Sequence, residues 1–555
     1  MKKRFLNFIL VQKADFYLLY YHTIRMDEIN TDTNICPKAF LDLSKANETV
    51  LDTIRKYLEP DKNDKKMFGE VFTPLYLVCD MLSKLPRHVW TNPDLVWLDP
   101  ANGIGNFPVV VYYKLMSGLE REIPNKTQRS RHIIENMLWM VELNPVNVNV
   151  CKKIFNILDP KSTPNIITGS FLEENTLKTL PSKFDVIIGN PPYNSGGSKQ
   201  SSERGIYKIF AESALSLLHK NGYLLFIHPP NYHRINKDEF YNVVKEHNLM
   251  YVRIFSEKEI KDLFNITGVR VDYYLLQKKS YTGKTIIQDD KNNITTINIS
   301  LYDTIPNFGF SIIDKLFALQ KKIGSYKSDL GRSSKFHTTR IKHNTAGKYK
   351  YVHTITKDGI NYTKSDEKQD VIGIPKLIFN GFGYSYIYYD ETGNCGTTQV
   401  PFYLLNPTKK DLILFMSPLI QYLLDAFRIK GQNSGIDSLV YYLPDLSQMK
   451  FNTYKELLEE LHITSKEQKE ISAYKVLEFP HVFIFKDTED SAEGKKKRSV
   501  KKQNCRTSKS KHELELRDKF RRSVKIQTCR TSKSKHKLEL RDKFRRSVKK
   551  TIHKQ

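Results

Sequence analysis

The sequence predicts an α/β fold built on a parallel sheet. From about residue 68 to residue 280, short apolar segments of strand length alternate with longer segments of helical spacing. Such alternation is typical of strand–helix units that bury a sheet between helices. A glycine-rich loop, residues 99–105, follows one apolar segment and precedes an apolar helix. This is where α/β proteins bring their backbone close to a ligand.

The expected elements follow from the spacing of apolar residues and from the turn-forming residues between them. The expected strands are Leu95–Leu98, Met137–Val141, Asn165–Ile167, Val186–Ile188, Gly222–Ile227 and Val252–Phe255, with a last pair around Val269–Leu276. The expected helices are Leu75–Leu85, Pro108–Met116, Pro145–Leu158 and Tyr207–Leu218.

A chain of 555 residues is too long for one hydrophobic core and predicts two or three domains. Residues 281–306 are polar, as in a linker or a connecting hairpin, and an amphipathic helix is expected at Ser311–Lys322. The residues up to about 480 are rich in Tyr, Ile and Gly, which favours a mixed α/β or β-rich module. The expected parts are a helical extension at 1–64, the α/β domain at 65–285, the second region at 286–480 and a basic repeat tail at 481–555.

The formal net charge of +27 comes mainly from the tail. Residues 495–555 hold 25 Lys and Arg against 5 Asp and Glu, whereas the first 494 residues hold 63 against 56. The tail repeats with a period of 24 residues, since Cys505–His512 recurs as Cys529–His536. Repeats this polar predict disorder or short helices. We expect sequence-independent binding to a polyanion, with a solubilising tail or a localisation signal as the alternatives.

Cysteine usage and hydropathy bound the cellular setting. The six cysteines show no C-x-x-C pair, so neither a metal site nor a disulfide framework is expected. No apolar stretch approaches the about 18 residues of a membrane-spanning helix. The sequence therefore predicts a soluble intracellular protein without a membrane partner, cytoplasmic in a bacterium and nuclear or in a viral factory otherwise.

The most informative segment is Phe184–Tyr193. A buried strand, Val186–Ile188, is followed by Gly189, Asn190, two prolines and Tyr193. The strand must end there, because proline cannot donate a ladder hydrogen bond. What remains is a rigid corner with a side-chain amide, backbone carbonyls and an aromatic ring. This set of groups suits an exocyclic amino group on a planar ring.

Polar residues also stand at the ends of other expected elements. Glu142 ends an apolar strand, where a carboxylate in an α/β cofactor fold can accept hydrogen bonds from ribose hydroxyls. Thr73 and Pro74 precede an apolar helix and are expected as its N-cap and first residue. Each of these features has a purely structural alternative. Glu142 could be an ordinary solvated acid, Thr73 and Pro74 could simply start a helix, and the glycine-rich loop at residues 99–105 could be a structural turn.

Three motifs occur in an informative order along the chain. Phe72–Pro74, Asp99–Gly105 and Asn190–Tyr193 resemble the Phe-Thr-Pro, S-adenosylmethionine-binding and Asn-Pro-Pro-Tyr motifs of gamma-class N6-adenine-specific DNA methyltransferases of type II restriction–modification systems. The resemblance extends over about residues 65–280, and more loosely over 310–450. It implies a Rossmann-like S-adenosylmethionine-dependent methyltransferase sheet, followed by a mixed α/β target-recognition region.

The resemblance also implies roles for individual residues. The residues expected to bind S-adenosylmethionine are Phe72, Thr73, Pro74, Asp99, Ala101, Gly103, Gly105, Glu142, Ser170 and Phe171. The expected catalytic group is Asn190, Pro191, Pro192 and Tyr193, with Phe264 as a second aromatic wall or, alternatively, a core residue. The sequence departs from the family pattern at Asn102, Ile104 and Ser170, where Cys, Ser and Asp are usual.

We therefore expect a site-specific methyltransferase that acts on the N6 amino group of adenine in double-stranded DNA after base flipping. The alternatives are an RNA-base or protein-glutamine methyltransferase with the same corner, and a nucleic-acid-binding protein with an inactive methyltransferase fold. The sequence leaves open a separate restriction endonuclease as a partner. It also leaves open the oligomeric state, and a monomer is compatible with it.

Sequence recognition is expected in residues 330–450. Basic residues among aromatics are candidates for contacts to phosphates or base edges, although a solvated charged face is the alternative. They are Arg340, Lys342, His343, Lys348 and Lys350. Gly393–Gln399 loosely resembles a stretch of the target-recognition regions of the family.

Overall fold

The computed structural model describes residues 73–193, 205–233, 240–266, 269–326, 331–332, 346–356, 359–380, 387–397, 400, 402–428, 436–474 and 476. The chain divides into two units, Met1–Pro480 and His481–Gln555, and every described residue belongs to the first. The expected N-terminal extension, the basic tail and Phe72 lie outside the described residues. So do Arg340, Lys342 and His343.

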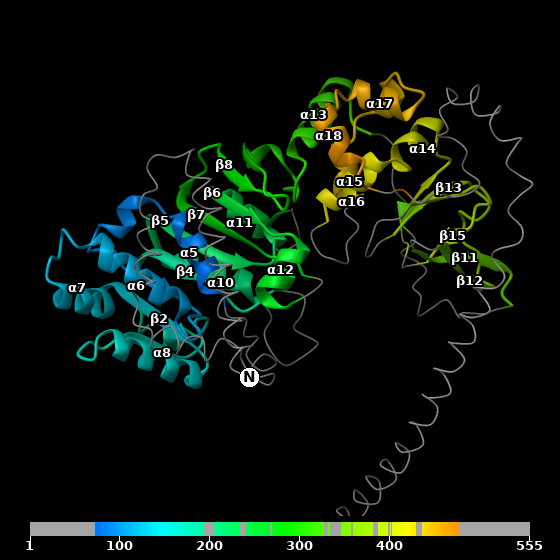
Figure 1. Cartoon of the computed structure of the whole chain (residues 1–555). Helices are drawn as coiled ribbons and strands as arrows, with labels where there is room; N and C mark the ends of the chain where they lie inside the picture. The colour runs from blue at the N-terminus through cyan, green and yellow to red at the C-terminus, as the bar shows by residue number, and fades with distance from the viewer. Residues whose placement is uncertain are drawn as a thin grey trace, which may run out of the picture. The chain divides into compact units, whose positions relative to one another are not determined.

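A nine-stranded sheet forms the larger part of the described chain (Figure 1), with the strand order β3-β2-β1-β4-β5-β7-β6-β8-β9. Its strands are β1 (Trp97–Asp99), β2 (Leu138–Glu142), β3 (Asn165–Thr168), β4 (Phe184–Gly189), β5 (Leu218–His228), β6 (His247–Ile254), β7 (Asp272–Ser280), β8 (Thr285–Gln288) and β9 (Ile294–Ile297). The first five strands in this order are parallel. The fold is thus α/β, as expected.

The sheet is mixed, with antiparallel strands added to the parallel part that was expected. Strand β7 lies antiparallel between β5 and β6, and one strand replaces the pair expected around Val269–Leu276. Strand β8 runs parallel to β6, and β9 pairs antiparallel with β8. The polar segment expected as a linker or hairpin therefore contains a hairpin that extends the sheet.

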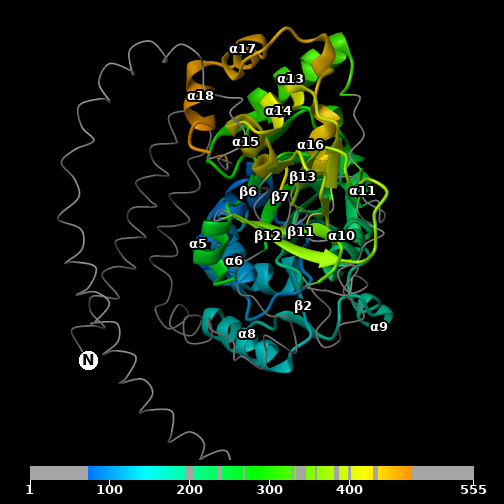
Figure 2. The ribbon, with the colours of Figure 1, turned by 90° about the vertical axis from the view of Figure 1, so that its right-hand side faces the viewer.

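Helices cover the sheet. They are α5 (Leu75–Ser83), η2 (Arg87–Trp90), α6 (Asn106–Gly118), α7 (Lys126–His132), η3 (Ile133–Met137), α8 (Pro145–Leu158), α9 (Glu174–Leu177), α10 (Ile206–Leu217), η4 (Asn231–His233), α11 (Phe240–Lys245) and α12 (Glu257–Phe264). Helices α5 and α6 lie side by side (Figure 2). Val186 and Ile188 of β4 join their apolar side chains in one buried cluster, because alternate strand residues point to the same face. This core holds the carboxyl ends of β1, β2 and β4 in place.

The remaining described residues form two smaller sheets and a group of helices. The four-stranded sheet has the order β10-β16-β13-β14 and the three-stranded sheet the order β12-β11-β15. Their strands are β10 (Gly331–Arg332), β11 (Tyr349–Thr356), β12 (Gly359–Ser365), β13 (Lys376–Phe379), β14 (Ile387–Asp390), β15 (Cys395–Gly396) and β16 (Phe402–Leu405). The region is mixed α/β, which is one of the two expected forms.

Helices α13 (Phe310–Ile323), α14 (Lys409–Phe415), α15 (Pro418–Ala426), α16 (Ile436–Leu439), α17 (Tyr454–Glu460) and α18 (Ser465–Ile471) accompany these sheets, with the short turns η5 (Ile299–Leu301), η6 (Val440–Tyr442) and η7 (Leu446–Gln448). The helix expected at Ser311–Lys322 lies within α13. Among the described residues, no helix has the length and apolar character needed to cross a membrane.

Candidate active site

The glycine loop connects β1 to α6 at the carboxyl edge of the large sheet. Gly103 and Gly105 have φ values of +55° and +100°, which side chains other than glycine rarely adopt. A Cβ atom on Gly105 would lie 2.8 Å from Cys151 Sγ, so α8 packs directly against the loop. The Asn102 amide donates a hydrogen bond to the Val141 carbonyl over 3.1 Å and fastens the loop to β2.

Glu142, the last residue of β2, holds the same loop from the other side. Its carboxylate accepts a hydrogen bond from the Gly103 amide over 2.8 Å and another from the Asn144 amide over 2.7 Å. Both carboxylate oxygens of Glu142 therefore act as hydrogen-bond acceptors at the edge of the loop. The buried acid thus lies beside the glycine loop, as its position in the sequence suggested.

Asp99 ends β1 and is almost fully buried. Its Oδ1 atom accepts a hydrogen bond from the Ala101 amide over 3.1 Å, and its Oδ2 atom has no hydrogen-bond partner among the described residues. Burial, together with the nearby charge of Glu142, raises the pKa of Asp99 well above its usual range. Burial therefore favours the protonated form of Asp99, and a cation beside the carboxyl group would favour the ionised form.

Asn102 and Ile104, the two departures from the family pattern in this loop, both point inward. The Asn102 side-chain nitrogen donates to the Gly103 carbonyl over 2.9 Å and lies 3.4 Å from Cys151 Sγ. Ile104 is buried in the core cluster. Both side chains therefore stabilise the loop, and neither fills the space in front of it.

The end of β4 approaches Asp99 so closely that only glycine fits. A Cβ atom on Gly189 would lie 2.8 Å from Asp99 Oδ1, and Gly189 has a φ of +152°. The next residue, Asn190, donates from its side-chain nitrogen to Thr73 Oγ1 over 3.1 Å. The Thr73 carbonyl in turn accepts from the Asn106 side chain over 2.8 Å. These contacts join all three sequence motifs at one edge of the sheet.

The Thr73 contact corrects the expected start of α5. The helix begins at Leu75, Pro74 is its N-cap residue, and no side chain caps it by a hydrogen bond. The Pro74 carbonyl accepts the first helical bond, from Val78. The hydroxyl of Thr73 does not cap the helix, because it bonds to Asn190, 117 residues away.

Tyr193 and Phe264 belong to the same apolar surroundings. Phe264 ends α12 as a buried member of the core cluster, and the half-buried Tyr193 packs against that cluster. The Tyr193 ring stands edge-on to Tyr207, with centroids 6.4 Å apart. Its hydroxyl has no hydrogen-bond partner among the described residues. Burial, with a smaller effect of Asp272, raises the pKa of Tyr193.

The remaining expected ligand residues lie around this edge. Pro191 is buried and Pro192 half-buried directly after Asn190. Ser170 is half-buried after β3, where its hydroxyl accepts from the Leu172 amide over 3.3 Å. Phe171 is buried, with its ring centroid 5.4 Å from that of Phe210 in α10. The packing of Phe171 on a ligand ring stays a prediction.

A buried aromatic and polar group behind the corner was missed from the sequence. His228, at the end of β5, stacks on Tyr207 with ring centroids 4.7 Å apart. Its Nδ1 lies 2.9 Å from the Pro229 carbonyl, to which it donates, and its Nε2 can then accept from the Tyr274 hydroxyl at 3.1 Å. Burial lowers the pKa of His228 to about 4. The signal was a histidine followed by two prolines at the end of an apolar strand.

Asp272 completes this buried group at the start of β7. It accepts a hydrogen bond from the Tyr232 hydroxyl over 2.9 Å and lies 2.7 Å from His233 Nε2. Both His233 and Asp272 are fully buried. The sequence offered no spacing that connects residues 233 and 272, because strand β7 brings them together only by its pairing with β5 and β6.

Of the expected DNA contacts, Lys348 and Lys350 are described. Lys350 is in β11, and its Nζ lies 3.6 Å from the ring centroid of Tyr362 in the neighbouring strand β12. Lys348 is exposed just before β11. In the stretch Gly393–Gln399, β15 pairs with β11, while Thr398 and Gln399 lie outside the described residues. Basic and aromatic side chains thus share the β11–β12 hairpin.

Part of the chain matches known methylases. Residues 120–264 match the family described as Eco57I restriction-modification methylase. An uncharacterized adenine-specific methylase of Mycoplasma pneumoniae is 26% identical over 323 residues, which cover 43% of this chain and 75% of the relative. Both findings support a methyltransferase, and the family match supports one of the restriction–modification type.

Solved structures of restriction–modification enzymes are also similar. The type IIL enzyme MmeI in complex with DNA matches with a TM-score of 0.48 and 12% identity over 75% of this chain and 77% of MmeI. The M protein of the type I enzyme EcoKI matches with a TM-score of 0.32 and 16% identity over 39% of this chain. The match spans about half of the EcoKI M protein, 48% of its length.

Proposed function

We propose that this protein is a site-specific DNA methyltransferase that transfers a methyl group from S-adenosylmethionine to the N6 amino group of adenine. The observation that carries the proposal is the junction of the motifs at one sheet edge. Gly189 lies against Asp99, and Asn190 is hydrogen-bonded to Thr73. An amide corner for an amino group therefore adjoins a loop built for a charged ligand.

The residues around the glycine loop fit S-adenosylmethionine. The buried Asp99 Oδ2 atom, which lacks a partner among the described residues, suits the positively charged amino group of the methionine part. Glu142 suits the ribose hydroxyls, and Gly103 and Gly105 leave room for close approach of the backbone. When bound, the cofactor supplies a methyl group that is already electrophilic.

The corner would then prepare the amino group. The lone pair of an adenine amino nitrogen is delocalised into the ring, so the nitrogen is a poor nucleophile. The Asn190 side-chain oxygen and the Pro191 carbonyl can accept the two amino hydrogens and concentrate electron density on nitrogen. Positioning and electrostatics would supply most of the rate acceleration.

Tyr193 and Phe264 would hold the base from its two faces. A base inside a duplex cannot reach such a corner, so the target adenine must be flipped out of the helix. Double-stranded DNA is then the partner. Residues 286–480 would read its sequence, with Lys348 and Lys350 on the β11–β12 hairpin as candidates for phosphate contacts.

Methyl transfer from labelled S-adenosylmethionine tests the proposal. Unmethylated DNA, RNA and a protein mixture are offered together, and label is expected in DNA on N6-methyladenine. Label confined to RNA or to protein glutamine would contradict the proposal and favour the other substrates of the same corner. Sequencing of the methylated positions then gives the recognition sequence.

The variant Asn190→Ala tests the corner. Transfer should fall by at least about 100-fold, because positioning of the reacting groups is lost, while binding of S-adenosylmethionine measured by calorimetry stays within a factor of a few. Asn175→Ala, which changes an exposed asparagine of α9, is the matched control and should be fully active. A fully active Asn190→Ala protein would refute the mechanism.

A further inference from the structure

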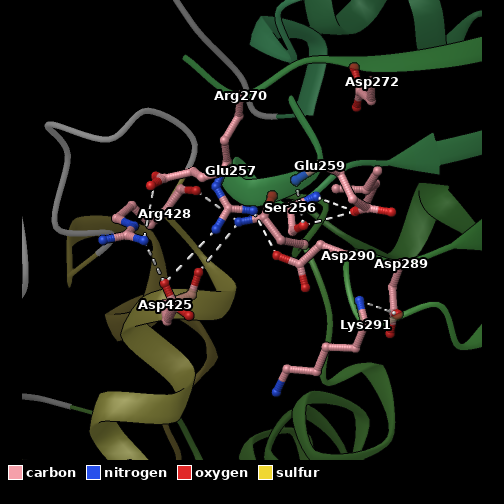
Figure 3. Close-up of polar contacts among 12 residues, drawn as sticks. Ser256, Glu257, Glu259, Arg270, Asp272, Asp289, Asp290, Lys291, Asp425 and Arg428 are labelled. Carbon is pink, nitrogen blue, oxygen red and sulfur yellow. Dashed lines mark hydrogen bonds and ion pairs between the residues drawn. The ribbon is translucent and has the colours of Figure 1, made fainter. Parts of the chain in front are cut away.

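We propose that helix α15 positions α12, and with it Phe264, through a cluster of charged residues, so that the C-terminal region controls the aromatic wall of the target-base site. The cluster, called here the α12–α15 junction, consists of Glu257, Arg270, Asp290, Asp425 and Arg428 (Figure 3). The inference deepens the proposed function and rests on it for the role of Phe264.

Two of these charges bracket Phe264 along the chain. Glu257 is the first residue of α12 and Phe264 is its last. Arg270 lies two residues before β7, which begins at Asp272. Whatever holds Glu257 and Arg270 therefore fixes both ends of the segment that carries Phe264. The capping box of Ser256 and Glu259 defines the start of α12 at this same N-terminal end, next to Glu257.

Helix α15 holds both of these residues. Arg428, two residues beyond α15, has its Nη2 atom 3.5 Å from Glu257 Oε1 and 3.0 Å from Asp425 Oδ1. Asp425, in the last turn of α15, also lies 3.9 Å from Arg270 Nη2. Figure 3 shows Asp425 and Arg428 reaching from α15 toward Glu257 and Arg270. One carboxylate thus connects the two arginines.

The arginines of the junction are shielded from solvent, whereas the side chains of Asp425 and Glu257 are 29% and 38% exposed. The Arg270 and Arg428 side chains are 4% and 10% exposed, and Arg270 Nη1 forms a 2.8 Å hydrogen bond with Asp290 in the β8–β9 turn. Ion pairs on an open surface contribute little. Removing one partner of a shielded pair costs more, since the other charge stays buried.

Other contacts hold α15 without the junction, from Lys291 in the β8–β9 turn and from the segment that precedes α13. The Asn307 amide donates to the Ala426 carbonyl over 2.7 Å, and its side chain donates to the Arg428 carbonyl over 2.8 Å. Lys291 Nζ lies 3.7 Å from the ring centroid of Phe308 and 4.2 Å from that of Tyr422 in α15. These contacts would hold α15 in place even without the junction. Loss of the Glu257 contact should therefore affect α12 alone.

Glu257→Gln isolates this effect. The substitution removes the charge that α12 offers to Arg428 and leaves the Arg428–Asp425 pair in place. With unmethylated plasmid DNA as substrate, kcat is expected to fall about 10- to 100-fold, as for a small misplacement of a reacting group. The KM for S-adenosylmethionine should stay unchanged, and the amides of α12 should exchange hydrogen faster.

Lys315→Gln is the matched control. Lys315 of α13 lies 2.6 Å from Glu467 of α18, so the control breaks a partly shielded ion pair of the C-terminal region that does not involve α12. Its kcat and the exchange of α12 should equal those of the wild type. Arg428→Lys, which keeps the positive charge, should retain more activity than Arg428→Gln.

Wild-type kcat and wild-type exchange in Glu257→Gln would overturn the inference, as would a fall in kcat that Lys315→Gln reproduces. The exchange measurement also separates this inference from the proposed function. If the wild-type protein transferred no methyl group to DNA, the proposed function would fail. The coupling would still be supported if plasmid DNA slowed the hydrogen exchange of α12 in the wild type but not in Glu257→Gln. If plasmid DNA did not slow this exchange in the wild type, the coupling would be contradicted.

Discussion

The large sheet and the C-terminal sheets differ in how their cores are built. One buried cluster runs from α5 and α6 through β1, β4 and β7 to α12. In the C-terminal sheets, a described cluster holds four buried residues, Val352, Ile355, Ile378 and Val400. The residues of the candidate active site, whose positions must be precise, are thus supported by the larger hydrophobic core. Lys350 lies in β11, whose buried residues Val352 and Ile355 belong to the smaller cluster, so substitutions there should disturb less of the protein.

The sharpest test of this contrast is Gly189→Ala in the large sheet. The added methyl group would meet Asp99 Oδ1 at 2.8 Å, so the Asp99 side chain or the end of β4 must shift where the glycine loop and Asn190 meet. We expect methyl transfer to fall by about 100-fold or more and affinity for S-adenosylmethionine to fall as well. Calorimetry and labelled transfer measure the two effects.

The matched control is Gly283→Ala in the turn between β7 and β8. Gly283 also has a positive φ, +80°, but a Cβ atom there would meet nothing within 4 Å. The strained backbone should cost about 1 kcal/mol, with activity retained. Normal cofactor binding in Gly189→Ala would show that the sheet edge yields more easily than its packing suggests.

Truncation of one buried isoleucine in each region compares the two cores directly. Ile188→Ala and Ile378→Ala should each lower the free energy of unfolding by about 2–5 kcal/mol, with the larger value for Ile188, since its cluster is larger and relaxes less. Urea unfolding of the full chain measures both. Cofactor affinity should fall in Ile188→Ala and stay near wild type in Ile378→Ala. Equal loss of cofactor affinity in both would contradict the contrast.

The two regions should also differ in acid sensitivity. His228 is buried with a pKa of about 4, below the about 6.5 of an unfolded chain. The unfolded state therefore binds the proton first, and stability falls as the pH drops from about 6.5 to about 4, by about 3 kcal/mol. Unfolding curves at several pH values should show this loss in the wild type and a flatter profile in His228→Gln.

Glu467 of α18 should make a smaller contribution to the pH dependence of stability, and at lower pH than His228. Hydrogen bonds from Lys315, Ser311 and Thr464 lower its pKa to about 2, against the opposing effect of burial. Its contribution is present above about pH 4.5 and is lost as the pH falls toward 2. The stability difference between the wild type and Glu467→Gln should therefore shrink over that range. A difference that is constant with pH would exclude this role.

Local signals explain what the sequence predicted well. Helix α8 spans Pro145–Leu158, as expected, because proline occupies its first position and the Asn144 side chain caps it by accepting from the Val146 amide. The ends of β1, β2 and β4 were also predicted, since each apolar run stops at a polar residue or a glycine. Asp99, Glu142 and Asn190 were therefore expected at or directly after the ends of these strands.

What the sequence did not predict depends on distant pairing. The direction of β7 cannot be read from an apolar run, because it follows from the strands on either side. The buried group of His228, Tyr232 and Asp272 arises from that same pairing. Thr73 was expected to cap a helix, and nothing local revealed that Asn190 would compete for its hydroxyl.

That hydroxyl has a consequence for discrimination between bases. With its nitrogen directed at Thr73, the Asn190 amide can present only its oxygen in the opposite direction. A base with an amino group at this position offers hydrogens to that oxygen, whereas guanine offers the lone pairs of its O6 atom. The two oxygens would repel each other. A threonine 117 residues upstream would thereby exclude the wrong purine by orienting a single amide.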